Sequence, residues 1–315
     1  MSNLYKFYNN RQKDDIIIFH EGDFNETHQE DIIRGRPEIS FYHLKGINWE
    51  VYPQRIQGTE SDWLFKDFTV GYRHMIRLYA IRIWHVVAQL GYEYVCRFDD
   101  DSLLLSDIKY NLFDFMIQHK LDYAYRNFCN ESGSTGGLWW DWHEPYLKTM
   151  KEKFGHDPKW LMQQCDKCDE FKQHCCGEFL GFYNNFFVAN VTRFLQPDIQ
   201  HYLKTMDETG FMYTKRWNDL IIQSMAVQLF IPSNKVFRFR DWSYAHNSGR
   251  PNRLGFGIVQ LRENEPHPDE EMNRIIAEEL MWPPITRMLR KKPDTCTLRM
   301  EGEMFTLSQP AFRLN

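Results

Sequence analysis

The chain has 315 residues, of which 43% are hydrophobic and 16% aromatic, so it can bury a sizeable core and is not intrinsically disordered. Its 38 basic and 43 acidic residues give a formal net charge of -5 and are interspersed along the sequence. This pattern disfavours a nucleic-acid partner, which requires a basic stripe. No stretch approaches the ~20 apolar residues of a membrane-spanning helix, and no signal peptide is expected at the N-terminus.

The first third of the chain predicts strands separated by one long helix. The apolar run within residues 15–24 predicts a buried strand ending in a polar loop, and residues 38–44 predict a second strand. Apolar residues at a helical period over residues 72–90 predict an amphipathic helix, which Gly91 ends. Residues 93–98 then predict another strand.

The remainder of the chain predicts a mixed series of helices and strands. Asp107 is expected to cap a helix over residues 111–119. Residues 130–173 are rich in Gly, Trp and charge, and predict loops over a cleft. Residues 263–315 predict an appendage that contains one helix near residues 270–281. The further elements predicted are strands over 121–126 and 179–190, and helices over 191–206 and 217–230.

This order predicts an α/β fold with a mixed sheet flanked by helices. We expect a single domain over residues 1–262 and a C-terminal extension over residues 263–315 that packs on it. In such folds ligands bind beyond the carboxyl ends of the strands. His20, Glu21 and Asp23 follow the first predicted strand, so we expect them to line a nucleotide site.

Three consecutive carboxylates, Asp99 to Asp101, follow the predicted strand 93–98. One residue separates Asp99 from Asp101, so on an extended backbone their side chains point to the same side. Two hard oxygen donors at a strand end suit Mg²⁺ or Mn²⁺ that also binds a substrate diphosphate. Asp-rich turns are also common without a metal, so the run alone is a weak signal.

The cysteines leave two chemistries open. Cys165, Cys168, Cys175 and Cys176 cluster around His174, which fits disulfides in an oxidising lumen or a zinc site in a reducing compartment. The spacing matches no established zinc module. Three glycosylation sequons also occur, and they are weak support for a secretory route.

Several ordered stretches of the sequence resemble a known enzyme family. Residues 70–80, 92–116, 181–190, 211–230 and 242–247 resemble, in order and spacing, the fungal α-1,2-mannosyltransferases of glycosyltransferase family 15. The resemblance implies a GT-A fold, GDP-mannose as donor and Mn²⁺ as cofactor. It also implies transfer, with retention of configuration, to a glycan or glycoprotein acceptor.

The resemblance assigns expected roles to individual residues. Asp99 takes the position of the family's metal-binding Glu, Asp101 that of the following Asp, and His246 that of the second metal ligand. Asp100 stands where the family has Pro and is expected to be dispensable. The residues expected to bind or position substrates are Tyr72 near the donor sugar, Arg73 on a phosphate or carboxylate, and Asp219 as a substrate-side acid.

One departure from the family concerns the catalytic step. The family's candidate nucleophile is a Glu, and Phe187 occupies its position here. Three outcomes remain: same-face substitution directed by the leaving phosphate, another acid such as Glu178 or Asp219, or altered chemistry. The last includes another donor sugar, inversion, or a silent glycan-binding protein. Loop residues Trp139, Trp140 and Trp142 are expected to offer faces to acceptor sugars.

The resemblance leaves two cellular compartments open for this protein. If it extends to cell biology, this chain is the Golgi-lumen part of a protein whose membrane anchor is missing from the sequence. A cytoplasmic enzyme fits the start of the chain equally well.

Overall fold

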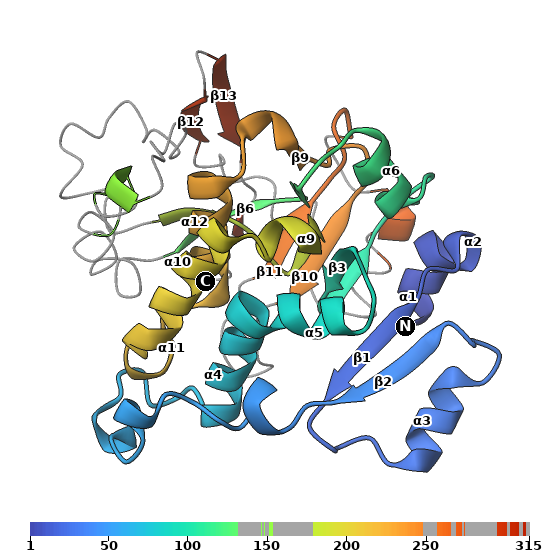
Figure 1. The fold of residues 1–315 in the computed structure, drawn as a ribbon. Coiled ribbons are helices and arrows are strands. Elements are labelled where there is room, and N and C mark those ends of the chain that lie inside the picture. The colour runs from blue at the N-terminus through green and yellow to red at the C-terminus, as the bar shows by residue number, and fades with distance from the viewer. Residues whose placement is uncertain are drawn as a thin grey trace.

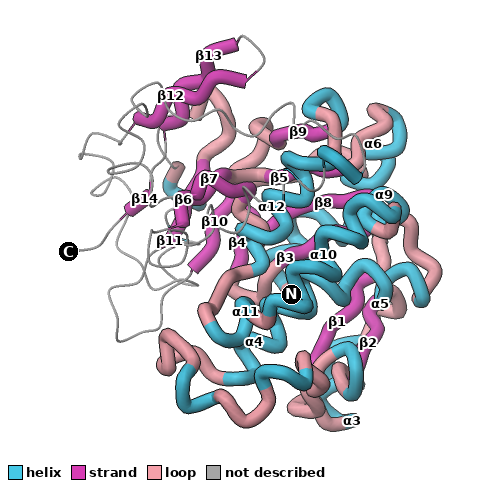
Figure 2. Tube along the Cα trace, turned by 60° about the vertical axis from the view of Figure 1, so that its left-hand side comes forward, coloured by secondary structure: helices cyan, strands magenta, loops and turns pink. Residues whose placement is uncertain are grey.

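The structure is a computed structural model. It describes residues 1–131, 146, 148, 151–153, 179–247, 257–265, 269–272 and 274, together with three strands between residues 295 and 312. Figures 1 and 2 show these parts as a mixed α/β arrangement, with helices α5, α9, α10 and α12 beside the central strands. The predicted α/β class is therefore confirmed.

The helical segments along the described chain are α1 (Ser2–Leu4), η1 (Tyr5–Asn9), α2 (Asn10–Gln12), α3 (Glu26–Ile33), η2 (Gly46–Asn48), η3 (Gln54–Ile56), η4 (Glu60–Asp62), α4 (Val70–Arg77), η5 (Leu78–Arg82), α5 (Ile83–Gln89), α6 (Leu112–Gln118), α9 (Val191–Phe194), α10 (Pro197–Thr209), α11 (Phe211–Thr214), α12 (Asp219–Phe230) and η7 (Ser233–Lys235). The strands are β1 (Ile16–His20), β2 (Ile39–His43), β3 (Tyr94–Phe98), β4 (Ser102–Leu104), β5 (Tyr123–Tyr125), β6 (Phe128–Glu131), β7 (Phe179–Phe182), β8 (Phe186–Asn190), β9 (Val236–Arg238), β10 (Tyr244–Asn247), β11 (Gly257–Gln260), β12 (Thr295–Met300), β13 (Glu303–Ser308) and β14 (Ala311–Phe312).

Two four-stranded sheets form the centre of the described structure. One has the strand order β3-β8-β5-β9, and the other has the order β14-β11-β10-β4. Strand β8 is antiparallel to both β3 and β5, whereas β5 and β9 are parallel. The chain passes from the first sheet to the second between β3 and β4, where the three aspartates lie. Parallel strands β1 and β2 form a separate pair, which lies beside α5 in both views (Figures 1 and 2).

The β3-β8-β5-β9 sheet is covered on both faces, because successive side chains of a strand point to opposite sides. Phe187 and Ala189 of β8 join the core formed with α5, α10 and α12. Phe186 and Val188 of the same strand join a second core, formed with α6, the N-terminal helical segment and β10. Burial on both faces explains why the sequence of β8 is an apolar run rather than an alternating one.

The helix predicted over residues 72–90 is confirmed as α4, η5 and α5, which continue one another through the π-helical segment η5. Thr69 begins it, since its side chain accepts a hydrogen bond from the Tyr72 backbone N–H. Gly91 follows its end with a φ of +92°, a conformation that glycine adopts without steric cost. Trp84 on α5 stacks on Phe194 of α9 with ring centroids 3.7 Å apart, which packs α5 against α9.

Two predicted elements were wrong in their extent. The strand predicted over residues 179–190 is two strands, β7 and β8, which pair with different partners and are separated by a turn at residues 183–185. The helix predicted over residues 191–206 is interrupted, because Pro197 begins a new helix, α10. The other predicted strands and helices within the described residues occur where expected, to within a few residues at their ends.

The predicted role of Asp107 was also wrong. Asn111 caps α6, because its side-chain oxygen accepts hydrogen bonds from the backbone N–H groups of Phe113 and Asp114. Asp107 instead lies 3.3 Å from the Arg11 guanidinium, in a partly exposed ion pair. The helix predicted near residues 270–281 lies mostly outside the described residues.

The N-terminal helical segment is joined to β4 through one buried side chain. Asn3 donates a hydrogen bond from Nδ2 to the Leu104 carbonyl (2.9 Å) and accepts one at Oδ1 from the Leu104 N–H (2.8 Å). The amide thus satisfies the edge of β4 as a neighbouring strand would. Since β4 begins directly after the three aspartates, Asn3 also restrains the chain at that point.

We expect Asn3→Ala to lower the free energy of unfolding by about 2–4 kcal/mol, because it leaves two buried backbone groups of Leu104 unpaired. Urea denaturation measures the change. Asn10→Ala is the matched control, since Asn10 is exposed and its replacement is expected to cost less than about 0.5 kcal/mol. Equal stability of Asn3→Ala and the wild type would contradict this role.

Candidate active site at the junction of the two sheets

Asp99 and Asp101 lie in the turn that carries the chain from β3 to β4. The Ser102 N–H donates to the Asp99 carbonyl (3.0 Å), which closes the turn, and the Asp99 N–H donates to the Asn185 carbonyl (3.2 Å). These two bonds hold the turn against the start of β8. The two carboxylates are therefore presented at the carboxyl end of β3, as the sequence predicts.

His246 reaches the same place from β10, where it lies opposite Ser102 in the antiparallel register with β4. Its Nδ1 is 3.0 Å from Asp101 Oδ1 and 3.2 Å from Ser102 Oγ. Its ring packs edge-on against Tyr183, with ring centroids 5.4 Å apart. The imidazole is buried, with a side chain only 6% exposed, whereas the Asp101 side chain is 43% exposed and faces solvent.

Asp99, Asp101 and His246 can hold one metal ion. One ligand atom from each lies within 4.8 Å of the other two. Two carboxylates and an imidazole form a donor set that suits Mn²⁺, since oxygen ligands favour hard divalent ions and the imidazole favours Mn²⁺ over Mg²⁺. Three protein ligands leave coordination positions for substrate oxygens, so the residues present fit the predicted metal.

Arg97 lies beneath this cluster and joins it to Asp219. Its Nε and Nη2 donate to the two oxygens of Asp99 (2.6 and 3.2 Å), and its Nη1 donates to Asp219 Oδ2 (2.5 Å). The guanidinium also lies over the Tyr79 ring, 3.7 Å from its centroid. Burial opposes the charge on Arg97, but Asp99 and Asp219 outweigh it and raise the pKa of Arg97 well above its ordinary value.

Two asparagines of the turn before β8 complete the site. Asn184 Nδ2 donates to Asp219 Oδ2 (2.9 Å). Asn185 Nδ2 donates to Asp99 Oδ2 and lies 2.9 Å from His246 Nε2. Sequence reasoning missed Arg97 and both asparagines. Arg97 was accessible from the sequence, because it lies two residues before Asp99 on the same strand face.

Comparison with known proteins identifies the family. Residues 1–251 match the family described as glycolipid 2-alpha-mannosyltransferase. The chain belongs to this family. The glycolipid 2-alpha-mannosyltransferase of Saccharomyces cerevisiae is 25% identical to it over 239 residues, which cover 73% of this chain and 52% of the relative. Glycolipid 2-alpha-mannosyltransferase 1 of Candida albicans is 28% identical over 177 residues, covering 56% of this chain and 39% of the relative.

Two solved structures of mannosyltransferases share the fold. Core-mannan synthase A of Aspergillus fumigatus, in its Mn/GDP form, superposes with a TM-score of 0.65 at 20% identity and covers 77% of this chain and 68% of its own. Ktr4p of S. cerevisiae in complex with GDP gives 0.66 at 20% identity and covers 77% of this chain and 65% of its own. The fold is therefore GT-A, as predicted. The chain spans about half the length of the curated relatives it matches.

Phe187, at the position where the resemblance implies a Glu, is part of the core. It is 1% exposed, and its ring packs against Tyr123 and Trp84 with centroids 5.8 and 6.0 Å away. In the register of β3 with β8 it lies directly opposite Arg97, on the same face of the sheet. No group that could accept a proton or attack a sugar therefore stands at this position.

The prediction that Arg73 holds a phosphate is corrected by its hydrogen bonds. The side chain is buried, and its guanidinium donates to four backbone carbonyls. The acceptors are the carbonyls of Leu64 (2.7 Å), Phe65 (2.9 Å), Phe68 (3.4 Å) and Tyr213. Four of the five guanidinium N–H groups are thereby used, so Arg73 holds the loop before α4 against α11.

Tyr72 lies next to Arg73 at the start of α4, but its side chain makes different contacts. Its hydroxyl accepts a hydrogen bond from Arg216 Nη2 (3.0 Å), and its ring packs on Phe68, with centroids 4.7 Å apart. The Arg216 guanidinium also lies over the Phe68 ring. A role for Tyr72 toward a donor sugar remains a prediction.

His20 lies at the carboxyl end of β1 and is buried against the end of β2. Its ring stacks on His43, with centroids 5.2 Å apart, and its Nδ1 accepts a hydrogen bond from the Gly22 N–H. Its place at a nucleotide remains a prediction. Other predicted site residues lie outside the described residues, namely Glu178, the three tryptophans Trp139, Trp140 and Trp142, and the cluster of four cysteines with His174.

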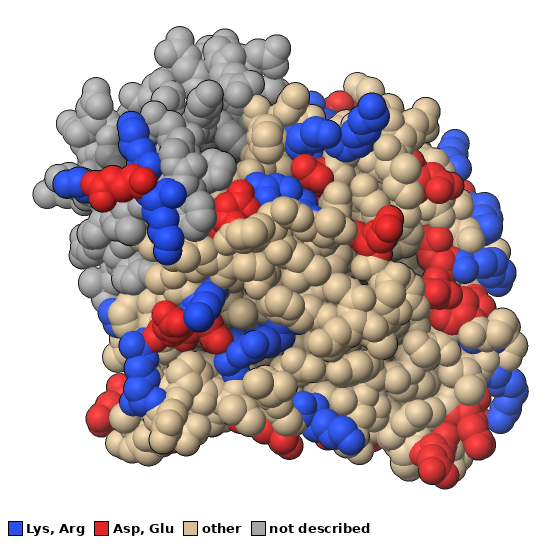
Figure 3. Space-filling view, in the orientation of Figure 1, with Lys and Arg blue, Asp and Glu red and all other residues tan. Residues whose placement is uncertain are grey.

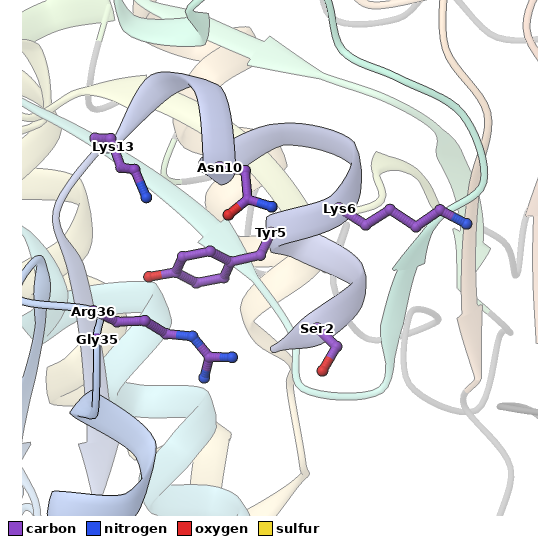
Figure 4. A pocket seen from close by; sticks show the side chains of 7 residues that line it. All are labelled: Ser2, Tyr5, Lys6, Asn10, Lys13, Gly35 and Arg36. Carbon is purple, nitrogen blue, oxygen red and sulfur yellow. The ribbon is translucent and has the colours of Figure 1, made fainter.

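A hollow of about 420 Å³ lies at the N-terminal segment, lined in part by Tyr5, Lys13 and Arg36 (Figure 4). None of its lining residues belongs to the Asp99 cluster. The Tyr5 hydroxyl is already bonded to Glu38 (2.7 Å), and Lys13 lies 3.7 Å from the same carboxylate. Figure 3 shows basic and acidic residues interspersed on the face of the molecule seen in Figure 1, without a basic stripe.

We expect Arg73→Leu to lower the free energy of unfolding by about 3–5 kcal/mol, because several buried carbonyls lose their donor at once. Arg73→Lys is not expected to restore it, since one ammonium cannot span acceptors on both loop and helix. Urea denaturation measures both variants. A variant that is as stable as the wild type but binds GDP weakly would restore the phosphate role.

Proposed function

We propose that this protein is a Mn²⁺-dependent mannosyltransferase that transfers mannose from GDP-mannose to a glycan or glycoprotein acceptor. The observation that carries the proposal is the convergence of Asp99, Asp101 and His246 from two sheets, with Arg97 and Asp219 behind them, in a chain of the mannosyltransferase family. Its structural neighbours include a Mn/GDP form and a GDP complex.

Each residue of the cluster has a defined task in this reaction. Asp99, Asp101 and His246 would hold the Mn²⁺, which when bound would neutralise the charge that develops on the departing diphosphate. Arg97 holds the Asp99 carboxylate in place through two hydrogen bonds. Asp219 faces the same guanidinium and is proposed as the acid on the substrate side. Tyr72 and His20 are proposed to line the sites of the donor sugar and the nucleotide.

Phe187 shapes the chemistry that we propose. A phenyl ring cannot form a glycosyl intermediate, so an attack by a side chain at this position is excluded. We propose an α-1,2-type transfer with retention by same-face substitution. The acceptor hydroxyl enters on the face that the diphosphate leaves, and the departing phosphate oxygen takes its proton. Asp219, which shares the Arg97 guanidinium with Asp99, is the described acid that we propose could supply the missing function instead.

The broader setting is part of the same proposal. We propose that residues 1–262 form the GT-A domain and residues 263–315 an extension; β14 of this extension pairs with β11 of the domain. We further propose that the enzyme works in the Golgi lumen. In the described part of the chain, no helix is long and apolar enough to cross a membrane.

Mannose transfer is expected to require Mn²⁺ and to stop on addition of EDTA. Asp99→Ala and Asp101→Ala are each expected to lower kcat/KM about a hundredfold or more, because several kcal/mol of charge stabilisation at the diphosphate are lost. Asp100→Ala is the matched control, since Asp100 is exposed and is expected to keep near wild-type activity. Release of GDP measures all three. Activity that survives EDTA would overturn the metal assignment.

The new glycosidic bond is expected to have the α configuration, which NMR of the product reads from the anomeric proton. A β product would show that the Phe187 position has changed the reaction to inversion. A protein that binds GDP-mannose, seen as a rise in Tm with Mn²⁺, but forms no product would instead be a glycan-binding member of the family.

Asp219→Asn tests the alternative acid and is expected to lower kcat if Asp219 takes part.

A further inference from the structure

We infer that Asn184 and Asn185, adjacent in the turn before β8, are positioning residues for two different parts of the site. Asn185 sets the relative positions of the metal ligands Asp99 and His246, and Asn184 sets the position of Asp219. These two separate roles rest on the proposed function, because they assign Asn185 to the metal ligands and Asn184 to the substrate-side acid.

Asn185 joins groups that come from different sheets. Asp99 directly follows β3 of one sheet, and His246 belongs to β10 of the other. The single Nδ2 of Asn185 donates to Asp99 Oδ2 and lies 2.9 Å from His246 Nε2. Its backbone carbonyl also accepts from the Asp99 N–H (3.2 Å). Side chain and backbone of one residue thus fix the distance between two ligands.

The contact of Asn185 with His246 also fixes the imidazole. His246 Nδ1 faces Asp101 Oδ1 and Ser102 Oγ, and Nε2 faces Asn185, so both ring nitrogens have partners. The ring cannot rotate without losing contacts on both sides. Groups outside the ligand set that orient a histidine in this way typically contribute 10–100-fold in metal affinity.

Asn184 points to the other half of the site. Its Nδ2 donates to Asp219 Oδ2 (2.9 Å), the same oxygen that accepts from Arg97 Nη1 (2.5 Å). Asn184 is 3% exposed and Asp219 is 7% exposed, so this carboxylate is held by two buried donors. The structure gives Asn184 no hydrogen bond to Asp99, Asp101 or His246.

The turn can serve both halves because it is anchored at both ends. The N–H of Phe182, at the end of β7, donates a hydrogen bond to Ser224 Oγ (2.8 Å). Phe186, at the start of β8, is 2% exposed and lies opposite Phe98 in the β3 register. A short turn between two buried residues holds its two amides in fixed and divergent directions.

The test compares Mn²⁺ binding with turnover in the wild type, Asn185→Ala and Asn184→Ala. Free Mn²⁺ is followed by EPR at a fixed GDP concentration, and kcat and KM for GDP-mannose are measured over a range of Mn²⁺. Asn185→Ala is expected to weaken Mn²⁺ binding 10–100-fold and to recover activity as Mn²⁺ is raised. Asn184→Ala is expected to bind Mn²⁺ within about twofold of the wild type, with a lower kcat that added Mn²⁺ does not restore.

Each outcome either supports or overturns the separate roles of Asn185 and Asn184. Equal loss of Mn²⁺ affinity in both variants would mean that the turn is merely structural and would overturn the inference, as would wild-type affinity in Asn185→Ala. A wild-type protein that binds no Mn²⁺ would overturn the proposed function itself. If Asn185→Ala does not fold, Asn185→Ser replaces it with the same expected loss, because a serine side chain is too short to span the two ligands.

Discussion

The buried guanidinium of Arg97 is the interaction on which the rest of the site depends. It joins Asp99 at the end of β3 to Asp219 at the start of α12, and Tyr79 of η5 covers its face. Removing one partner from a buried ion pair leaves an uncompensated charge, which typically costs about 3–5 kcal/mol. The Arg97 guanidinium is planar, and its N–H groups match the spacing of carboxylate oxygens. It therefore holds β3, the turn after it, η5 and α12 in one arrangement.

The charges around Arg97 also support the divalent cation that we propose for this site. Asp99, Asp101 and Asp219 bring three negative charges, and Arg97 compensates one of them. The remaining charge of minus two lies at an exposed edge, with a carboxylate whose side chain is 43% exposed. One divalent ion balances this charge formally. The diphosphate of a donor would then bind to a site that is close to neutral rather than repelled by three acids.

The sequence pointed to the proposed metal ligands more clearly than to the residues that contact them. Asp99 and Asp101 are visible as a strand-end motif, and His246 became a candidate only through the family resemblance. Asn184 and Asn185 were hidden because they lie within an apolar run that resembles one strand, and only the pairing of β7 and β8 with different partners shows the turn. Arg73 was misassigned because its carbonyl partners come from tertiary packing, which local sequence does not encode.

A phenyl ring instead of an acid at position 187 fits this balance of charges around Arg97. It lies opposite Arg97 on the same face of the sheet, so an acid there would have its Cβ roughly 5 Å from that of Arg97 and would compete for its guanidinium. It would also raise the formal charge of the site to minus three. With a phenyl ring in its place, the donors of Arg97 serve Asp99 and Asp219 alone. The site thus keeps the charge that the proposed metal would balance, while Phe187 is part of the core.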